Sequence, residues 1–426
     1  MHDTDSPALT RAVLCAVDLG LWDAEASLRE LAELAKSADM EPLAELIQKR
    51  DSLDNATAMG GGKLMELELY IHNTGAEAVI FDHELSGVQI RNMEKACGVP
   101  VIDRTMLILE IFARRAATHE GKLQVELARQ RYLLPRLSGM GAELSRLGGG
   151  GGGAGAGARR GKGESKLELD RRHIRRRITA LEAQLKALTK RREQIRERRE
   201  KDGVTSVAVV GYTNVGKSSL LNALTGAGVL VEDKLFATLD PSARALKLPD
   251  GRTVLLIDTV GLVRRLPHHL VEAFRSTLDE AARADLILNV CDISSADAPE
   301  QADITQELLK ELGAQRVPVI NVLNKADLLT SPPEAMGERT AVISAKSGQG
   351  LLELLEKIAR LLPAKSRRLR LLIPYGQAGL AAEIRESGKI YEERFEPAGV
   401  LLDALVDEKL ISRVSPLITT DYDRGV

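Results

Sequence analysis

Short apolar runs alternate with amphipathic stretches over the first 104 residues. They lie at 12–17, 24–38, 78–81, 86–97 and 99–102. The short runs predict buried strands, and the longer stretches with a period near 3.6 predict helices. Strands that alternate with helices are typical of a mainly parallel sheet. We therefore predict a small α/β domain over residues 1–104.

Residues 105–203 show helical periodicity on both sides of a Gly-rich break. After the break, apolar residues recur at steps near three and four: Leu167, Ile174, Ile178, Leu181, Leu185, Leu188 and Ile195. Arg171 and Arg192 occupy two of the expected positions. Such a stripe predicts packing against a second helix. We predict two long antiparallel helices forming an arm, and the alternative is a solvated charged helix without a partner.

The break itself, residues 148–158, consists of eight Gly and three Ala. No side chain there buries apolar surface, so the loop cannot order itself against the protein. It is either a passive flexible link or a probe that becomes ordered on a partner. The sequence leaves both interpretations open.

Buried strands are predicted again at 207–210, 253–257, 317–323 and 341–343, within a domain that we place at 204–363. The remaining residues, 364–426, predict a strand at 368–373, a helix at 377–387 and an extended run at 390–406. We therefore expect a small C-terminal α+β domain, to which the sequence assigns no chemistry. The predicted fold class is multidomain α/β.

Charge is distributed unevenly along the chain. Over all 426 residues the formal net charge is −2, but residues 159–201 carry seventeen Lys or Arg against seven Asp or Glu. A local excess of ten positive charges favours docking of the arm on a polyanion. The three cysteines, Cys15, Cys97 and Cys291, are far apart and indicate neither a disulfide framework nor a zinc site. No apolar run approaches the length of a membrane span, and we expect a cytoplasmic protein.

Residues 211–218 (GYTNVGKS) match the pattern G-x-x-x-x-G-K-[ST] between a predicted strand and a predicted helix. In this setting backbone N–H groups surround a triphosphate, a lysine reaches the outer phosphates and a hydroxyl binds Mg²⁺. The predicted contacts are Gly211, Tyr212, Thr213, Asn214, Val215, Gly216, Lys217, Ser218 and Ser219.

Three further motifs follow predicted strands, and their order supports a nucleotide site. Asp258, Thr259, Val260 and Gly261 form D-x-x-G, which supplies a carboxylate near Mg²⁺ and a glycine N–H near the terminal phosphate. Asn324, Lys325 and Asp327 belong to N-K-x-D, and Ser344, Ala345 and Lys346 form a loop behind the base. The Asp327 carboxylate accepts two hydrogen bonds from guanine, whereas adenine lacks that donor pair. GTP is the predicted nucleotide.

These motifs together with several other stretches resemble the HflX family of ribosome-associated GTPases. The stretches are 101–105 (VIDRT), 120–127 (EGKLQVEL), 134–137 (LPRL), 164–172 (ESKLELDRR) and 266–278 (LPHHLVEAFRSTL). The resemblance covers most of the chain. It departs from the family's R-G-P-G-E after the glycines, because residues 160–164 are RGKGE, and it has Leu262 where the family usually has Phe.

The resemblance implies binding to the large ribosomal subunit and its rRNA, with a role in splitting or rescuing stalled or idle ribosomes. It places the Gly-rich loop near the peptidyl-transferase region, and it implies a monomer off the ribosome without DNA or peripheral membrane contact. Thr238 resembles the mobile threonine that closes on Mg²⁺ and the terminal phosphate, so Lys217, Thr238 and Gly261 are the expected catalytic residues. Ser218, Thr238 and Asp258 are the expected Mg²⁺ ligands.

Two features concern the rate of hydrolysis. Leu262 occupies the position at which Ras-like enzymes carry a Gln that orients the attacking water, so intrinsic hydrolysis should be slow. Asn214 resembles the asparagine with which some bacterial GTPases hold K⁺, and the alternative is that it stabilises the turn. Two other functions are considered: a signalling GTPase that recruits a protein through its arm, and an NTP-dependent RNA remodelling enzyme.

Overall fold

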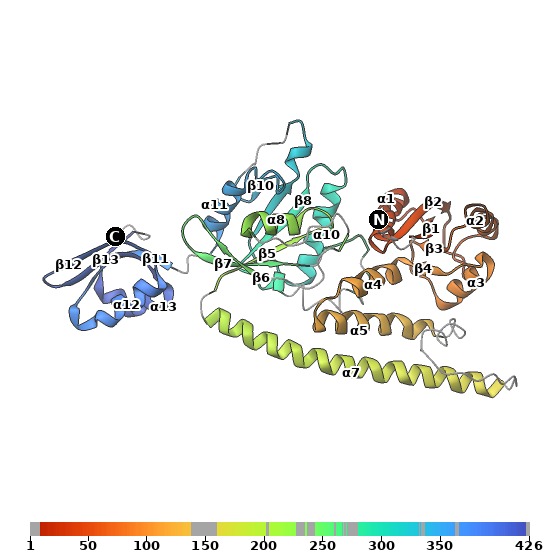
Figure 1. The fold of residues 1–426 in the computed structure, drawn as a ribbon, viewed down its shortest axis with the longest axis horizontal. Helices are drawn as coiled ribbons and strands as arrows, with labels where there is room; N and C mark the ends of the chain where they lie inside the picture. Colours follow the sequence, from red (N-terminus) through yellow and green to blue (C-terminus); the bar gives the residue numbers. More distant parts are fainter. Residues whose placement is uncertain are drawn as a thin grey trace, which may run out of the picture.

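Three separate sheets, of four, six and four strands, organise the chain. The structure, a computed structural model, describes residues 9–137, 160–201, 204–226, 235–236, 243–259, 261–265, 267, 270, 280–331, 333, 337–362 and 366–422. The three sheets follow one another in a row, with two helices along one side (Figure 1). The arrangement confirms the predicted multidomain α/β class.

The N-terminal sheet is parallel throughout. Its strands lie in the order β2 (Met40–Lys49), β1 (Thr10–Asp18), β3 (Ala78–Phe81) and β4 (Val101–Asp103). Its helices are α1 (Ala24–Ser37), α2 (Gly61–Thr74) and α3 (Gly87–Cys97). The sequence did not predict β2, because this edge strand mixes charged and apolar residues and is only partly buried.

The helical stretch after β4 is divided in two. Helix α4 (Arg104–Arg115) begins directly after the strand, and α5 (His119–Arg136) begins after Thr118, whose hydroxyl accepts a hydrogen bond from the N–H of Gly121 at 2.9 Å. Helix α4 contributes Ile108 and Phe112 to the apolar core shared with α1.

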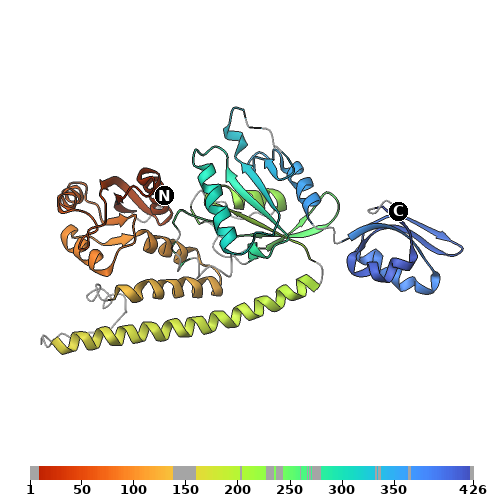
Figure 2. The same cartoon turned by 180° about the vertical axis from the view of Figure 1, so that it is seen from behind.

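Helices α5 and α7 (Arg160–Lys201) form the predicted arm. Leu123 and Leu127 of α5 pack against Leu181 of α7. Two ion pairs, Glu120–Arg192 and Arg131–Glu182, join the helices at 2.8 Å each. The later residue of α5 pairs with the earlier residue of α7, so the helices are antiparallel (Figure 2). The alternative of a helix without a partner is therefore wrong. The Gly-rich loop, 148–158, lies outside the described residues.

The central sheet has six strands, in the order β10 (Thr340–Val342), β9 (Val319–Asn324), β8 (Leu286–Asp292), β5 (Ser206–Gly211), β7 (Thr253–Asp258) and β6 (Ala243–Lys247). All neighbours are parallel except β6, which is antiparallel to β7. The helices described here are α8 (Lys217–Thr225), α10 (Ala298–Glu311), α11 (Leu351–Leu361) and the short η1 (Ala326–Leu328). Because β5, β7 and β9 are parallel, the motifs that follow them meet at one edge.

The C-terminal sheet is antiparallel, in the order β12 (Ile390–Glu396), β13 (Gly399–Asp407), β11 (Ser366–Ile373) and β14 (Ile418–Asp421). Its helices are α12 (Ala378–Ser387), α13 (Glu408–Val414), η2 (Tyr375–Gln377) and η3 (Ser415–Leu417). The run predicted at 390–406 is a hairpin rather than one extended segment, because the chain turns between Glu396 and Gly399. Among the described helices, none is long and apolar enough to cross a bilayer.

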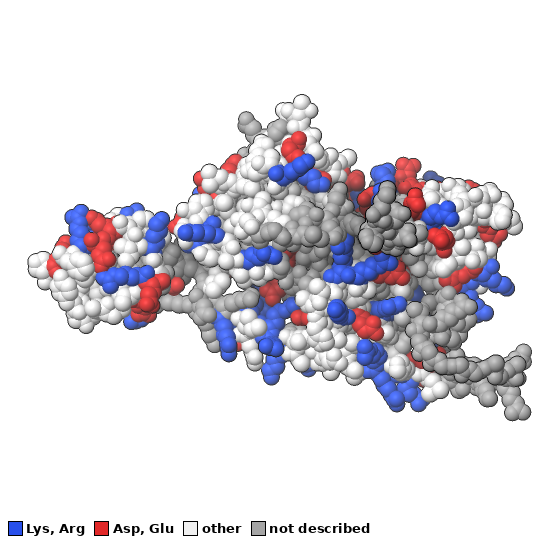
Figure 3. Space-filling model, viewed as in Figure 1, with Lys and Arg blue, Asp and Glu red and all other residues white. Residues whose placement is uncertain are grey.

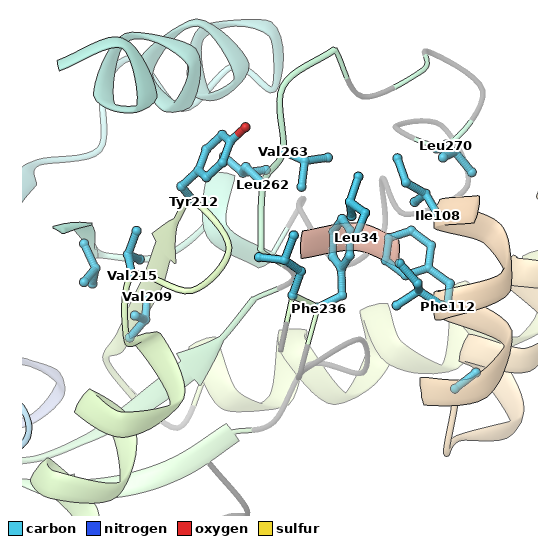
Figure 4. Close-up of a cluster of buried hydrophobic side chains, with 14 of the residues drawn as sticks. Leu34, Ile108, Phe112, Val209, Tyr212, Val215, Phe236, Leu262, Val263 and Leu270 are labelled. Carbon is cyan, nitrogen blue, oxygen red and sulfur yellow. The ribbon is translucent and has the colours of Figure 1, made fainter. Parts of the chain in front are cut away.

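The N-terminal and six-stranded domains share one continuous apolar core. Phe236 of the central domain packs edge-on against Phe112 of α4, with ring centroids 4.5 Å apart and an interplanar angle of 77°. Figure 4 shows Phe236 among Leu34 and Phe112, with Leu262 and Val263 nearby. Edge-to-face aromatic contacts favour specific geometry in addition to burying apolar area. The two domains are therefore packed against each other rather than only tethered.

Candidate nucleotide-binding site

Three of the predicted motifs meet at the carboxyl edge of the six-stranded sheet. Residues 211–218 connect β5 to α8, residues 258–261 follow β7, and residues 324–327 follow β9. Thr238 and Val260 lie outside the described residues, so their predicted roles stay predictions.

The loop between β5 and α8 needs glycine at two positions. Gly211 has φ +147° and Gly216 has φ +92°, a region that residues with a Cβ rarely adopt. A Cβ on Gly211 would lie 2.3 Å from the Val290 carbonyl oxygen, and one on Gly216 would lie 2.4 Å from Asn324 Nδ2. The loop backbone therefore passes close to Val290 and Asn324, and no side chain at these two glycines competes with the backbone N–H groups for space inside the loop. A loop of this shape fits a phosphate group.

Asn214 adopts the left-handed conformation, with φ 60°, and its side chain is exposed. Asparagine is one of the few residues with a Cβ that tolerate this conformation. The geometry supports the turn-stabilising role for Asn214, and the K⁺ role remains a prediction.

Lys217 is buried on the inner side of the loop, with 7% of its surface exposed. Its ammonium donates hydrogen bonds to the carbonyl oxygens of Gly211 at 3.0 Å and Tyr212 at 2.6 Å. Burial lowers the pKa of Lys217 to about 8, although the negative charge of Asp258 opposes that shift. A cation is thus held beside the phosphate loop at neutral pH.

Asp258 ends β7 and is almost completely buried, next to β5. The hydroxyl of the following Thr259 donates to the Val209 carbonyl at 2.8 Å, which fixes the start of this segment against β5. Ser218 occupies the second position of α8. A hydroxyl and a carboxylate are hard oxygen donors of the kind that Mg²⁺ prefers, so the residues present fit this metal.

The segment after Asp258 is joined to the phosphate loop through its backbone. The N–H of Leu262 donates to the Gly211 carbonyl at 3.2 Å, and the N–H of Thr213 donates to the Leu262 carbonyl at 2.8 Å. The Leu262 side chain is buried in the shared core, with 5% exposed. Leu262 therefore has a packing role and offers no polar group to a water molecule.

The third motif is fixed by side-chain hydrogen bonds. Asn324 donates to the Val215 carbonyl at 2.8 Å and accepts from the N–H of Ala345 at 2.9 Å, which ties the N-K-x-D loop to both the phosphate loop and the S-A-K loop. Asp327 is exposed and accepts from the Ser344 hydroxyl at 2.6 Å. That hydrogen bond lowers the pKa of Asp327, so its carboxylate is ionised at neutral pH.

Lys325 and Lys346 lie beside these residues predicted to bind the base. Lys325 has φ 66°, and its ammonium lies 2.7 Å from the carboxylate of Asp292 at the end of β8. Lys346 is exposed just after Ala345. The structure thus brings together the described members of both predicted base-binding motifs.

Sequence reasoning missed the residues that join this site to the N-terminal domain. The Tyr212 hydroxyl donates to Glu30 of α1 and accepts from the N–H of Arg264. Arg104, which is buried at the start of α4, also pairs with Glu30. These residues belong to no local motif, and Glu30 resembles any acidic residue on an amphipathic helix.

The site combines a lysine-bearing loop between a central strand and its helix with an acidic strand end and an N-K-x-D loop. This combination places the chain among the P-loop GTPases. Sequence profiles agree: residues 206–325 match the family described as 50S ribosome-binding GTPase. Residues 25–113 match GTP-binding GTPase N-terminal, and residues 115–199 match GTP-binding GTPase Middle Region.

Full-length relatives define the family. GTPase HflX of Caldanaerobacter subterraneus is 49% identical over 408 residues, which cover 96% of this chain and 94% of that protein. GTPase HflX of Lacrimispora saccharolytica is 44% identical, covering 95% of each chain, and that of Escherichia coli is 39% identical, covering 87% of each. The chain belongs to the HflX family of GTPases. A solved GDP complex of SsGBP is 25% identical with a TM-score of 0.49, covering 83% of this chain and 98% of that one.

Proposed function

We propose that this GTPase acts as a switch on the large ribosomal subunit, which it docks with through the basic arm in order to split or rescue stalled or idle ribosomes. The match of residues 206–325 to a family described as 50S ribosome-binding GTPase is the observation that carries the proposal. The basic arm supports it independently, because rRNA is a polyanion. We place the protein in the cytoplasm as a monomer off the ribosome.

GTP binds, in this proposal, with its phosphates on the N–H groups of residues 211–219 and beside Lys217. Ser218, Asp258 and Thr238 hold Mg²⁺, which neutralises charge on the phosphates. Asp327 accepts from guanine, while Asn324 keeps the base loop attached to the phosphate loop by the hydrogen bonds described above. Gly216, which has no room for a Cβ, allows that close approach.

Catalysis depends on groups that stabilise charge at the terminal phosphate. Lys217 and the N–H of Gly261 serve this purpose, and Thr238 closes on the phosphate when its segment orders. Leu262 is buried and apolar, so this chain orients the attacking water poorly by itself. Hydrolysis is therefore slow until the ribosome supplies a missing group or fixes the segment.

Docking uses the face of α7 that points away from α5. Arg175 and Arg176 are exposed there, whereas Ile174 faces the core. Arg177 is exposed as well, but it lies beside α5, where its Nε is 3.8 Å from Glu126 Oε1. Figure 3 shows Lys and Arg side chains along the lower edge of the molecule, where α7 lies in Figure 1. Among the described side chains of α7, arginines are exposed in series, whereas Leu169 and Ile195 are isolated exposed apolar residues far apart on the helix, which favours RNA over a protein partner. In this proposal the Gly-rich loop, 148–158, has the role of a probe that acts on the ribosome rather than that of a passive link.

Sedimentation through a sucrose gradient tests the proposal. Wild-type protein, incubated with 70S ribosomes and a nonhydrolysable GTP analogue, should co-sediment with 50S subunits and reduce the 70S peak, whereas GDP should leave it in the top fractions. Lys217→Ala is the control for nucleotide dependence. Free protein in every gradient would overturn ribosome docking, and binding without loss of the 70S peak would overturn splitting.

A further inference from the structure

The carboxyl ends of β1 and β3 form the point in the N-terminal sheet at which the strand order reverses. In the order β2-β1-β3-β4, the chain passes from β1 to β2 on one side of β1 and then crosses to β3 on its other side. Open α/β sheets commonly bind ligands at such a point, because the loops leaving the two strands diverge. Here the connection after β1 contributes Trp22 and Ser27, and the connection after β3 contributes Asp82 and His83.

The side chain of Arg265, from the segment after Gly261, occupies this place. Its guanidinium carbon lies 4.2 Å from the centroid of the Trp22 ring. Its Nη2 donates to both the Asp82 carboxylate and the Ser27 hydroxyl. An aromatic face together with a carboxylate and a hydroxyl is a chemical environment that recognises a guanidinium group.

We propose that Trp22, Ser27 and Asp82 form a guanidinium-binding site in the N-terminal domain, that its ligand is Arg265 of the same chain, and that occupancy depends on the nucleotide. The proposal rests on the proposed function, since it requires GTP at the phosphate loop. It extends that function by giving the N-terminal domain direct contact with the segment that responds to the terminal phosphate.

The charges around the site suit a cation. Asp82 is fully buried and lies 2.8 Å from a second arginine, Arg104, as well as against Arg265. Burial alone would raise the pKa of Asp82, but the two guanidinium groups outweigh burial and lower it, so the carboxylate stays charged.

The imidazole ring of His83 packs beside the indole ring of Trp22 and is neutral. The His83 ring lies 5.4 Å from that of Trp22, and burial lowers the pKa of His83 to about 4. At neutral pH His83 therefore adds no positive charge beside Arg265. Neither of its ring nitrogens has a hydrogen-bond partner among the described residues.

The position of Arg265 depends on whether a terminal phosphate is bound at Lys217. A Cβ on Gly261 would lie 2.7 Å from Thr213 Cγ2 and 3.0 Å from Lys217 Nζ, so not even a methyl group fits between these residues. A terminal phosphate bound at Lys217 on this side needs more room than a methyl group. The Gly261 segment must then move outward, and Arg265, four residues later, moves with it. Bound Arg265 therefore favours the diphosphate state.

The chain contains one tryptophan, Trp22, so tryptophan emission reports directly on this site. Full-length protein loaded with GDP should change its emission when GDP is replaced by a nonhydrolysable GTP analogue, because the guanidinium leaves the indole face. In Arg265→Ala the emission should be the same with either nucleotide. The ratio of GTP-analogue to GDP affinity should rise roughly tenfold in that variant.

Chemical rescue separates a binding site from general destabilisation. Methylguanidinium added to GDP-loaded Arg265→Ala should restore the wild-type GDP emission with a saturable dependence, while methylammonium at equal ionic strength should not. Asp82→Asn combined with Arg265→Ala should abolish the rescue. Circular dichroism establishes that each variant is folded, and Arg265→Lys tests the need for the planar group.

The outcomes also separate this inference from the proposed function. Wild-type emission that is identical with GDP and the analogue, although both bind in calorimetry, would overturn the inference and leave the GTP site intact. A nucleotide-dependent change that persists in Arg265→Ala would overturn it as well. Failure of either nucleotide to bind would instead count against the proposed function.

Discussion

Tyr212, the second residue of the phosphate-loop motif, donates its phenolic hydrogen to the carboxylate of Glu30, 182 residues earlier in the chain. Both residues lie where the two domains meet, and Tyr212 is only 4% exposed. Glu30 also pairs with the buried Arg104, while the Arg104 guanidinium donates to the Arg264 carbonyl at 3.3 Å. A polar network therefore connects the phosphate loop, the segment after Gly261 and the N-terminal domain.

Removing the Tyr212 hydroxyl should weaken this junction. Tyr212→Phe keeps the ring but leaves Glu30 and the Arg264 N–H without that partner, at a cost of about 1–3 kcal/mol in unfolding free energy. A lower urea midpoint for the transition that includes the N-terminal domain would show it. Tyr375→Phe is the matched control, because Tyr375 is 53% exposed and its hydroxyl donates to the Glu396 carbonyl. Equal midpoints for the two variants would contradict an energetic role for the Tyr212 hydrogen bond.

The lowered pKa of Lys217 predicts how GTP affinity depends on pH. The side chain is charged below its pKa of about 8 and loses its proton as the pH rises through that value. The contribution of Lys217 to GTP affinity should therefore be constant from pH 6 to 7, and the affinity should fall by up to roughly tenfold per pH unit above 8. Titration calorimetry at several pH values measures this dependence.

Lys217→Arg is the control for that pH profile. Arginine stays protonated throughout this range, so the decline attributable to Lys217 should disappear. Every other titrating group is the same for the variant and the wild type, including the guanine base of the ligand. If its affinity declines as steeply as that of the wild type, deprotonation of Lys217 is not the cause.

Asp327→Asn should change which base the protein prefers. The amide cannot accept both guanine hydrogen bonds, but it can donate to the extra carbonyl of xanthine. Hydrogen bonds to a charged group contribute about 1.5–3 kcal/mol, so GTP affinity should fall by roughly 10- to 100-fold while XTP affinity rises. Competition of GTP and XTP for a fluorescent nucleotide measures the preference. Ser344→Ala removes the hydrogen bond to Asp327 and the one accepted from the Ser347 N–H, but it keeps the Asp327 carboxylate and should retain a preference for guanine.

Much of the candidate site was predictable because each motif is local. Residues 211–218 and 324–327 combine residue type, spacing and a preceding strand, and parallel strands bring such segments to one edge. The contact of Arg265 with Asp82 joins residues 183 positions apart, and nothing in either local sequence indicates it. Such contacts depend on how two folded domains pack against each other, and the hydrophobic periodicity of each segment carries no information about that packing.

The same distinction applies to the fold. The prediction for β3 matches the observed strand, because Ala78–Phe81 is a continuous apolar run that is buried throughout. Strand β2 was missed because its pairing with β1, rather than its own pattern, makes it a strand. The break between α4 and α5 was also missed, since a single Thr118 cap interrupts an otherwise helical pattern.

Hydrolysis by the isolated protein should be slow and should accelerate when 50S subunits are added, because buried Leu262 offers the attacking water no polar group. Release of phosphate from GTP, measured with and without subunits, tests this. If Asn214 holds K⁺, replacing K⁺ by Na⁺ at constant ionic strength should reduce the rate. Equal rates in the two salts would leave Asn214 with its turn-stabilising role alone.

The basic arm should make ribosome binding strongly dependent on salt. Each rRNA phosphate that α7 neutralises releases a counterion and adds roughly 0.7–0.9 to the slope of log affinity against log salt. Replacing Arg175, Arg176 and Arg177 by Ala should weaken binding and reduce that slope by about two to three, because all three side chains are exposed.

A second set of substitutions controls for loss of charge in general. Arg385, Arg394 and Arg413 of the C-terminal domain are exposed, and replacing all three by Ala removes as many positive charges away from α7 and should leave the slope nearly unchanged. GTP affinity in the absence of ribosomes should be the same for both triple variants and the wild type, because neither set touches the phosphate loop. An unchanged slope in the α7 variant, measured by pelleting with 50S subunits across a salt series, would show that these arginines do not contact rRNA. The docking face would then have to be sought elsewhere on the molecule.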